Sequence, residues 1–363
     1  STVTRVMVHD AAVDAARFLA RGVDGEGRFR YTVDASTNRT LPGYDWPRHA
    51  GATYFLAQAA ALTKDSEISF AALRAASLLR DKALERCGDD ACVAHDNMAE
   101  IGSSALAIIA FAEIAKTGLD PTYRNAVVEL TSFLRAQQRP DGEFMHQYDR
   151  QARLRVDVQF LYFSGEATLG LARAFALTGD PADRDAASHA LHHLVTRAWS
   201  FFGDRYYFGE EHWTCQAMAD LWESAPDREA LEFCLRWQAY GRKLQHVAGD
   251  TPYDAEGAYS PDPVLTPRLT PVASRSEAAV STLDAATRAH VGEEDRRAID
   301  LQLRRSLALL VKKQFRPGPS HLFADPAAVH GAIPGSEVDW QLRIDYAQHA
   351  GSAMIRWLAV TPP

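Results

Sequence analysis

Four acidic residues lie at or near the start of helical stretches rich in small and apolar residues, and they are candidates for acid–base chemistry. Cleavage of a glycosidic bond needs two carboxyl groups, one protonated as the acid and one ionised as the nucleophile or base. The predicted catalytic residues are Asp45, Asp96, Glu166 and Glu211. A carboxylate at a helix start can instead serve only as a cap, and this alternative applies chiefly to Asp45, Asp96 and the similarly placed Asp345.

A second set of polar and aromatic residues is predicted to bind the substrate. An imidazole can orient a hydroxyl group, transfer a proton or bind a metal, and an arginine fork fits a carboxylate such as that of a uronic acid. The predicted substrate-binding residues are Trp46, Arg48, His49, Tyr162, Tyr207, His212, Arg275, Glu277, Asp345 and His349. Each has a structural alternative: a hydrogen-bonded histidine, an internal ion pair, or aromatic packing. The three histidines are far apart in sequence, and we expect no metal and no cofactor.

The motif Asp-x-x-x-His-Ala-Gly occurs twice, at residues 45–51 and 345–351, and indicates how these residues are positioned. On a helix the Asp and His share one face, and the Gly allows a neighbouring backbone to approach. Four further blocks, at 96–103, 160–167, 208–215 and 271–278, align with the two copies. The alignment places six polar residues at equivalent positions along six helices: His49, Glu100, Ser164, His212, Arg275 and His349. A motif that returns near the end of the chain predicts a ring that closes on itself.

Six other helical stretches alternate with the six helices that carry these aligned polar residues. They are predicted at 6–20, 67–85, 121–137, 181–198, 228–247 and 294–315. Each leads to its partner helix through a long connection, whereas the returns, such as 62–65, 177–180 and 224–227, are tight turns. The long connections therefore gather at one face, together with the N-termini of the second helices. Short aromatic runs at 27–33, 142–148 and 204–208 predict small β-hairpins at this face. We expect the Pro-rich run 251–271 to form an ordered loop over the opening of the ring at the same face.

The segment from Tyr162 to Asp180, YFSGEATLGLARAFALTGD, resembles the helical hairpins of six-hairpin glycosidases and N-acylglucosamine 2-epimerase-type enzymes. This resemblance implies an all-α (α/α)6 toroid of six helical hairpins, with the second helix of each hairpin inside and residues 1–363 forming a single domain. No motif fixes one family within that group. The segment from Leu134 to Phe144 also resembles the Gln-x-x-Asp-Gly-x-Phe repeat of terpene-cyclase and prenyltransferase toroids, but the strong metal or acid motif of those enzymes is not found.

Composition and cysteine content limit the remaining classes. The chain has 363 residues, of which 47% are hydrophobic, and its net charge of -8 disfavours nucleic acid as a partner. No apolar run reaches the roughly 20 residues of a membrane-spanning helix. Cys87 and Cys92 flank a turn and are predicted to form a disulfide, which favours a periplasmic or secreted protein over a cytosolic one with free thiols. Cys215 and Cys234 are expected to be buried, unpaired cysteines.

We therefore expect a carbohydrate-active enzyme, specifically a glycoside hydrolase acting on a poly- or oligosaccharide. The alternatives are a uronate lyase or epimerase that uses His, Tyr and Arg, and a non-catalytic glycan-binding toroid. Closure of the ring predicts that Asp45, His49, Asp345 and His349 converge, either as a site or as a clasp. The sugar, its linkage and the oligomeric state stay open at this point.

Overall fold

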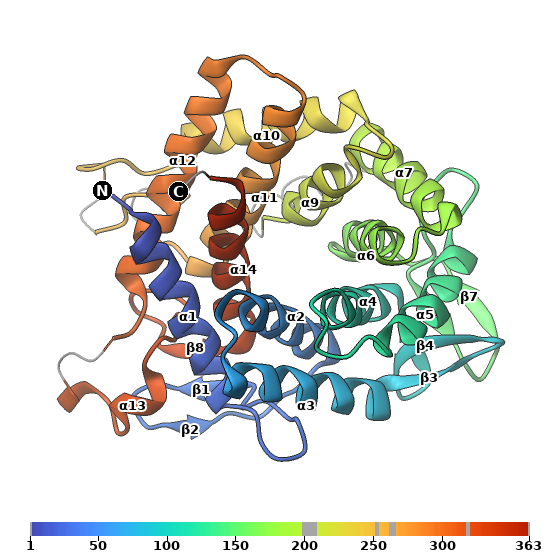
Figure 1. Cartoon of the computed structure of the whole chain (residues 1–363), viewed down its shortest axis with the longest axis horizontal. Coiled ribbons are helices and arrows are strands. Elements are labelled where there is room, and N and C mark those ends of the chain that lie inside the picture. Colours follow the sequence, from blue (N-terminus) through green and yellow to red (C-terminus); the bar gives the residue numbers. More distant parts are fainter. Residues whose placement is uncertain (1, 198–208, 251–253, 261–265, 317–319, 362–363) are drawn as a thin grey trace.

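Two concentric layers of helices form a ring in the computed structural model, which describes residues 2–197, 209–250, 254–260, 266–316 and 320–361 (Figure 1). The inner helices are α2 (Trp46–Thr63), α4 (Ile101–Lys116), α6 (Phe163–Thr178), α9 (Glu211–Leu221), α11 (Leu269–Arg288) and α14 (Ile344–Val360). The outer helices are α1 (Arg5–Arg21), α3 (Ser66–Ala83), α5 (Tyr123–Gln137), α7 (Pro181–Thr196), α10 (Arg228–Leu244) and α12 (Glu293–Lys313). Each inner helix contacts the next, and α14 contacts α2 to close the ring. The expected (α/α)6 toroid is confirmed.

Capping residues in the tight returns set the boundaries of the outer helices. Asp65, Asp180 and Asp227 are the N-caps of α3, α7 and α10, and each side chain accepts a hydrogen bond from a backbone N–H of the first turn. Lys64 and Gly179 end α2 and α6 in the left-handed conformation, which turns the chain back at once. The predicted outer helices are confirmed to within a few residues at each described end.

The inner helices pack closely because small residues face their neighbours. Every residue from Ile101 to Ile114 of α4 is buried, so this helix is enclosed on all sides. A Cβ at Gly351 of α14 would lie 2.1 Å from the ring of Phe55 on α2, so only glycine allows that packing. A Cβ at Gly51 of α2 would lie 3.1 Å from the side chain of Gln348 on α14. The predicted close approach of these two helices is thus confirmed.

Two small antiparallel sheets lie in the long connections that lead to the inner helices (Figure 1). In the first, β1 (Thr32–Asp34) pairs with β2 (Arg39–Thr40) and with β8 (Gln341–Arg343), which directly precedes α14. This sheet joins the connections before the first and last inner helices. The second sheet contains β3 (Leu84–Cys87), β4 (Asp90–His95), β5 (Met98–Glu100), β6 (Gln147–Asp149) and β7 (Leu154–Val156). A short helix, α13 (Pro326–Val329), lies in the last connection.

The second sheet corrects one part of the predicted helical pattern. Asp96 was expected one turn before Glu100 on a helix, but α4 begins only at Ile101. Asp96 and Asn97 instead form a two-residue turn between β4 and β5, and Asp96 has a positive φ of 52°. Asp and Asn tolerate this left-handed conformation better than most residues, so the pair is a hairpin signal. The predicted extension of α3 to Glu85 is wrong for a related reason, because residues 84–87 pair as β3.

All four cysteines form disulfides. The predicted Cys87–Cys92 disulfide joins β3 to β4. The expectation that Cys215 and Cys234 are unpaired is wrong, because the hairpin of α9 and α10 brings their Cα atoms to 5.9 Å and their sulfurs are bonded. Within the described residues, no helix combines the length and apolar character needed to cross a membrane.

Candidate active site

A cavity of about 440 Å³ opens where the inner helices begin. Its volume falls within the ~300–1,000 Å³ typical of small-molecule sites. The first turns of the inner helices supply most of its lining, and their unpaired N–H groups give this end a positive potential. The polar and aromatic residues that line it include Arg48, Tyr162, Glu166, His212, Trp213, Arg268, Arg343, Asp345 and His349. Six of these nine residues were predicted as site residues from the sequence.

Two histidines meet on one side of this cavity. The rings of His212 on α9 and His349 on α14 have centroids 5.2 Å apart and are nearly perpendicular. Glu277 on α11 lies between them: its Oε2 is 2.8 Å from Nδ1 of His349 and 4.0 Å from Nε2 of His212. Trp213 packs beside both rings, with centroid distances of 4.2 and 5.8 Å. Three inner helices therefore combine to build one cluster of titratable side chains.

The hydrogen bonds of His212 fix its tautomer. Its Nδ1 lies 2.6 Å from the carbonyl oxygen of Gly209, and a carbonyl can only accept, so we assign the proton of neutral His212 to Nδ1. Nε2 then carries a lone pair, and it has no hydrogen-bond partner among the described residues. Burial and the nearby His349 lower the pKa of His212 well below its usual range. His212 is thus a neutral base at neutral pH.

His349 has the opposite character. Burial alone would lower its pKa, but the Glu277 carboxylate, with a smaller effect from Asp345, raises the pKa above the usual value. Its Nδ1 donates to Glu277, which leaves Nε2 for a ligand. Two neighbouring groups whose pKa values are displaced in opposite directions make a suitable acid and base pair. The cluster can therefore hold one proton to donate and one lone pair to accept.

Three arginines, Arg48, Arg268 and Arg343, also line the cavity. Asp345 accepts from Nε and Nη2 of Arg343 at 2.6 and 2.8 Å, and from Nε of Arg48 at 3.4 Å. Burial would raise the pKa of Asp345, but the two arginines hold it below its usual value. Arg268 donates to the hydroxyl of Tyr346 at 3.2 Å. These side chains offer N–H donors to an oxygen that gains negative charge during a reaction.

Glu166 is the predicted catalytic carboxylate that lines the cavity. Burial and the charge of Glu210 raise its pKa to about 8, although Arg48 acts in the opposite direction. Its Oε2 has no hydrogen-bond partner among the described residues. A Cβ at Gly102 of α4 would lie 2.4 Å from this oxygen, so glycine makes room for the carboxyl group. Glu166 is therefore protonated at neutral pH and can donate a proton or a hydrogen bond.

The other three predicted catalytic carboxylates do not line this cavity. Asp45 is the N-cap of α2; it accepts from the backbone N–H of Arg48 and from the hydroxyl of Tyr31, and it pairs with the Arg48 guanidinium. The side chain of Asp96 is 92% exposed at its hairpin turn. Glu211 is buried against Nε of Arg275 at 3.5 Å. The capping alternative therefore describes the structure at Asp45.

Several predicted substrate-binding residues do not line this cavity and contact other parts of the protein. His49 donates from Nε2 to the carbonyl of Ala75 on α3 and accepts at Nδ1 from the Tyr44 hydroxyl at 2.6 Å. It faces the outer layer, so the expected convergence of His49 with His349 is wrong. The aromatic ring of Trp46 packs edge-on against His49. The guanidinium of Arg275 lies over the ring of Tyr259 and is buried. Tyr207 lies outside the described residues.

Ser164 belongs to a buried Ser–His–Glu cluster that does not have the polarity of a hydrolase triad. Nδ1 of His146 accepts from the backbone N–H of Phe160, so its Nε2 carries the proton and donates to Ser164 Oγ at 2.7 Å. The Ser164 hydroxyl donates in turn to Glu143. A serine nucleophile needs a histidine that accepts its proton. This cluster is a structural link between α6 and the preceding connection.

Sequence reasoning missed Arg268 and Arg343. Both are N-cap residues, of α11 and α14, and neither caps its helix through a side-chain hydrogen bond. Both lie where a long connection enters an inner helix, and both line the cavity. A basic residue at this position, where a cap is usual, was the signal available in the sequence.

The histidine cluster also contains the residues that could hold a metal ion. One ligand atom from each of His212, Glu277 and His349 lies within 4.8 Å of the others. Two imidazole nitrogens and a carboxylate oxygen suit zinc or a related divalent metal. A metal there would replace the direct hydrogen bond between His349 and Glu277.

Comparison with known proteins gives structural matches. No protein-family model and no curated sequence matches the chain. A D-mannose isomerase structure matches with a TM-score of 0.73 and 12% identity, covering 99% of this chain and 98% of that one. Cellobiose 2-epimerase from Bacillus thermoamylovorans gives 0.72 and 9% over 95% and 96% of the two chains. An unsaturated glucuronyl hydrolase specific for heparin gives 0.67 and 12% over 98% of both. The chain shares the six-hairpin toroid fold of these enzymes.

Proposed function

We propose that the protein is a carbohydrate-active enzyme that transfers a proton next to the carbonyl group of a reducing sugar, as a sugar isomerase or 2-epimerase. The observation that carries this proposal is the pair His212 and His349, with rings 5.2 Å apart and pKa values displaced in opposite directions. Positioned acid and base groups of this kind contribute ~10²–10⁴-fold to a reaction rate. The similarity to a mannose isomerase and a cellobiose 2-epimerase supports the same class.

The proposed reaction uses each histidine once in each direction. Nε2 of His212 takes a proton from the carbon next to the carbonyl, while His349 donates its proton to the carbonyl oxygen. The product of this step is a neutral enediol, and Arg48 or Arg268 stabilises the oxygen as charge develops. Return of the proton from His212 to the neighbouring carbon, with the hydroxyl proton on the original carbon passing to His349, gives the isomer. For the 2-epimer the enediol turns in the cavity, receives the proton from His212 on the other face of the same carbon, and returns the hydroxyl proton at carbon 1 to His349. Trp213 and Tyr162 provide aromatic surfaces for the sugar ring.

Exchange with solvent tests this proposal directly. The protein is incubated in D₂O with a panel of reducing mono- and disaccharides, and the products are followed by NMR. We expect a new sugar that carries deuterium at carbon 1 or 2. In His212→Gln, neither the new sugar nor the incorporated deuterium should be detected. The control is Arg236→Gln, which changes an exposed ion pair on α10. Sugars that stay unchanged and undeuterated throughout the panel would contradict the proposal.

A glycoside hydrolase is the second candidate, and the raised pKa of Glu166 favours it. Glu166 would act as the acid, and Asp345, held ionised by two arginines, would act as the second carboxylate. The similarity to an unsaturated glucuronyl hydrolase supports this reading. Release of reducing ends from oligosaccharides, abolished by Glu166→Gln, would establish it. A lyase would give a product that absorbs in the ultraviolet, and a binding module would retain glycans unaltered.

We also propose that the protein acts in the periplasm or outside the cell. Two disulfides in one chain favour an oxidising compartment. Alkylation of the freshly isolated, denatured protein without reductant should label none of the four cysteines. Labelling of all four would place the protein in a reducing compartment.

A further inference from the structure

A second cavity lies at the other end of the ring, where the inner helices end. Its volume is about 1110 Å³, and the second halves of all six inner helices line it together with the start of α1. It shares no lining residue with the cavity of the histidine pair. The proposed proton transfer therefore gives this second cavity no role.

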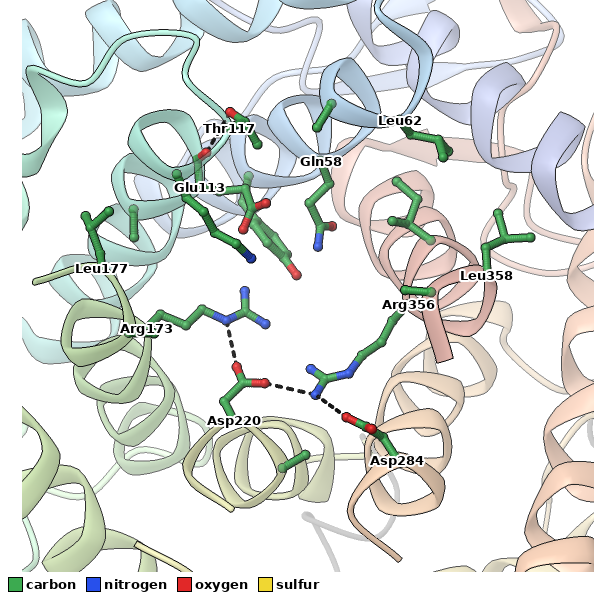
Figure 2. Close-up of a pocket in the computed structure, with 18 of the residues that line it drawn as sticks. Gln58, Leu62, Glu113, Thr117, Arg173, Leu177, Asp220, Asp284, Arg356 and Leu358 are labelled. Carbon is green, nitrogen blue, oxygen red and sulfur yellow. Dashed lines mark hydrogen bonds and ion pairs between the residues drawn. The ribbon is translucent and has the colours of Figure 1, made fainter. Parts of the chain in front are cut away.

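Two arginines point into this space from different sides of the ring (Figure 2). Arg173 on α6 and Arg356 on α14 both bind Asp220 on α9, at 3.1 and 2.9 Å. Arg173 uses Nε and Nη2 for its hydrogen bonds to Asp220 and Gln216, and its guanidinium lies 4.7 Å from the centre of the Tyr54 ring. Its Nη1 has no hydrogen-bond partner among the described residues. Arg356 contacts Asp220 and Asp284 through Nη2. Since a guanidinium has five N–H donors, both arginines keep donors for another partner.

An acceptor and an apolar wall complete the cavity. Gln58 on α2 points toward the space between the two arginines, and its Oε1 has no hydrogen-bond partner among the described residues (Figure 2). Leu62, Leu177 and Leu358 lie around the rim. A ligand with a compact apolar body and a polar head would match these surfaces better than water alone.

The lining carries an excess of positive charge. Its six basic residues are Arg5, Lys64, Lys116, Arg173, Arg288 and Arg356, and its three acidic residues are Glu113, Asp220 and Asp284. The difference of six minus three leaves three positive charges. Helix C-termini explain part of this excess, because Arg5 donates to two carbonyl oxygens at the end of α14 and Arg288 donates to one at the end of α9. Arg173 and Arg356 make no such contact with a helix end among the described hydrogen bonds.

We propose that this second cavity binds a small organic oxyanion, whose carboxylate or phosphate group lies between Arg173 and Arg356. Asp220 holds the two guanidinium groups in place, as the central carboxylate of an Arg–Asp–Arg arrangement. Arginine forks bind carboxylates and phosphates through paired N–H donors. The hydroxyl or amide groups of the ligand would donate to Gln58, and its apolar body would contact the leucine rim.

Calorimetric titration at low ionic strength tests this site with two probes, benzoate and phenyl phosphate. Benzyl alcohol is the neutral control, and inorganic phosphate shows what the anion contributes alone. We expect saturable binding of one molecule of benzoate or phenyl phosphate and none of benzyl alcohol. The tighter of the two probes identifies the anionic group that the cavity accepts. Failure of both to bind would overturn the proposal.

Variants locate the binding to this cavity. Arg173→Gln should weaken binding about tenfold or more, as expected for loss of a charge-assisted hydrogen bond. Leu62→Trp fills the rim without touching an ion pair, and it should weaken binding even if Arg173→Gln folds poorly. Arg236→Gln on the outer layer should bind as the parent protein does. If Arg268→Gln in the first cavity abolishes binding and Leu62→Trp does not, the anion binds in the first cavity and the proposal is wrong.

Discussion

The two ends of the ring differ in how their titratable side chains are paired. At the end where the inner helices begin, Nε2 of His212 and Oε2 of Glu166 have no hydrogen-bond partner among the described residues, and burial shifts the pKa of each side chain away from its usual value. At the other end, Asp220 binds two arginines, and Arg356 also contacts Asp284. The first end thus combines ion pairs, such as Asp345 with Arg343, with two titratable atoms that have no partner among the described residues, whereas at the second end the central carboxylate of Asp220 is paired with two arginines.

From this difference we infer that the first end is the site of the proposed reaction and that the second end holds the ring together. Groups with displaced pKa values and no protein partner cost stability, and they are typical of sites that act on a ligand. Ion pairs that join α6, α9, α11 and α14 keep four inner helices in register at their C-terminal ends. Both ends have a cavity, and among the described residues the pair formed by His212 and His349 lies in the first.

The largest expected effect is on turnover at the first end. His349→Gln keeps a donor for Glu277 but cannot transfer a proton, so kcat/KM should fall by ~10²–10⁴-fold. The melting temperature should change little, because glutamine keeps the hydrogen bond to Glu277. Steady-state kinetics and a thermal melt measure the two quantities. A much lower melting temperature with normal kcat/KM would instead mean that His349 serves to hold the ring closed.

At the second end the expected effect is on stability. Asp220→Asn leaves Arg173 and Arg356 without their shared carboxylate, and loss of one partner of a buried ion pair costs ~3–5 kcal/mol. The free energy of unfolding should fall in urea denaturation, while turnover below the transition stays normal. Asp81→Asn, which removes an exposed ion pair with Arg80, is the matched control. Normal stability with lost turnover would reverse the roles assigned to the two ends.

The disulfides should stabilise the ring to different extents. Cys215–Cys234 closes the loop between α9 and α10, with a sequence separation of 19, whereas Cys87–Cys92 has a separation of 5. Loop-closure entropy gives ~3 kcal/mol for the longer loop and ~2 kcal/mol for the shorter one. Urea denaturation of the two double Cys→Ala variants measures both values. A larger loss of unfolding free energy for the Cys87–Cys92 variant would show that native packing, and not loop length, determines how much each disulfide stabilises the protein.

The smallest effect is on the pH dependence of activity. Because the pKa of His212 is lowered and that of His349 is raised, kcat/KM should rise with pH as His212 loses its proton below the usual histidine pKa of ~6.5. It should fall again above that value as His349 loses its proton, and each limb should approach tenfold per pH unit. His349→Gln should remove the alkaline limb from any residual activity. A single alkaline limb near pH 8 that disappears in Glu166→Gln would instead favour the hydrolase.

The sequence predicted the axial position of residues along the inner helices but not their direction around each helix. The motif at 45–51 and its copy at 345–351 were placed correctly at the start of two neighbouring inner helices. His349 faces the cavity, yet His49 faces α3, and the adjacent Arg48 lines the cavity instead. One residue rotates a side chain by about 100° around a helix, so an alignment that ignores the helix orientation cannot separate these two.

Local chemistry in the sequence determined the hairpins of this protein. Capping residues such as Asp65 and Asp180, tight returns and alternating apolar stretches act over a few residues, so they specify twelve helices without knowledge of their neighbours. The disulfide between Cys87 and Cys92 is local for the same reason. Only the tertiary structure decided the contacts between distant segments. It paired Cys215 with Cys234, joined Asp345 to Arg48, and brought Glu277 between His212 and His349. Those contacts depend on the rotation of each inner helix, which is set by the packing of the whole ring.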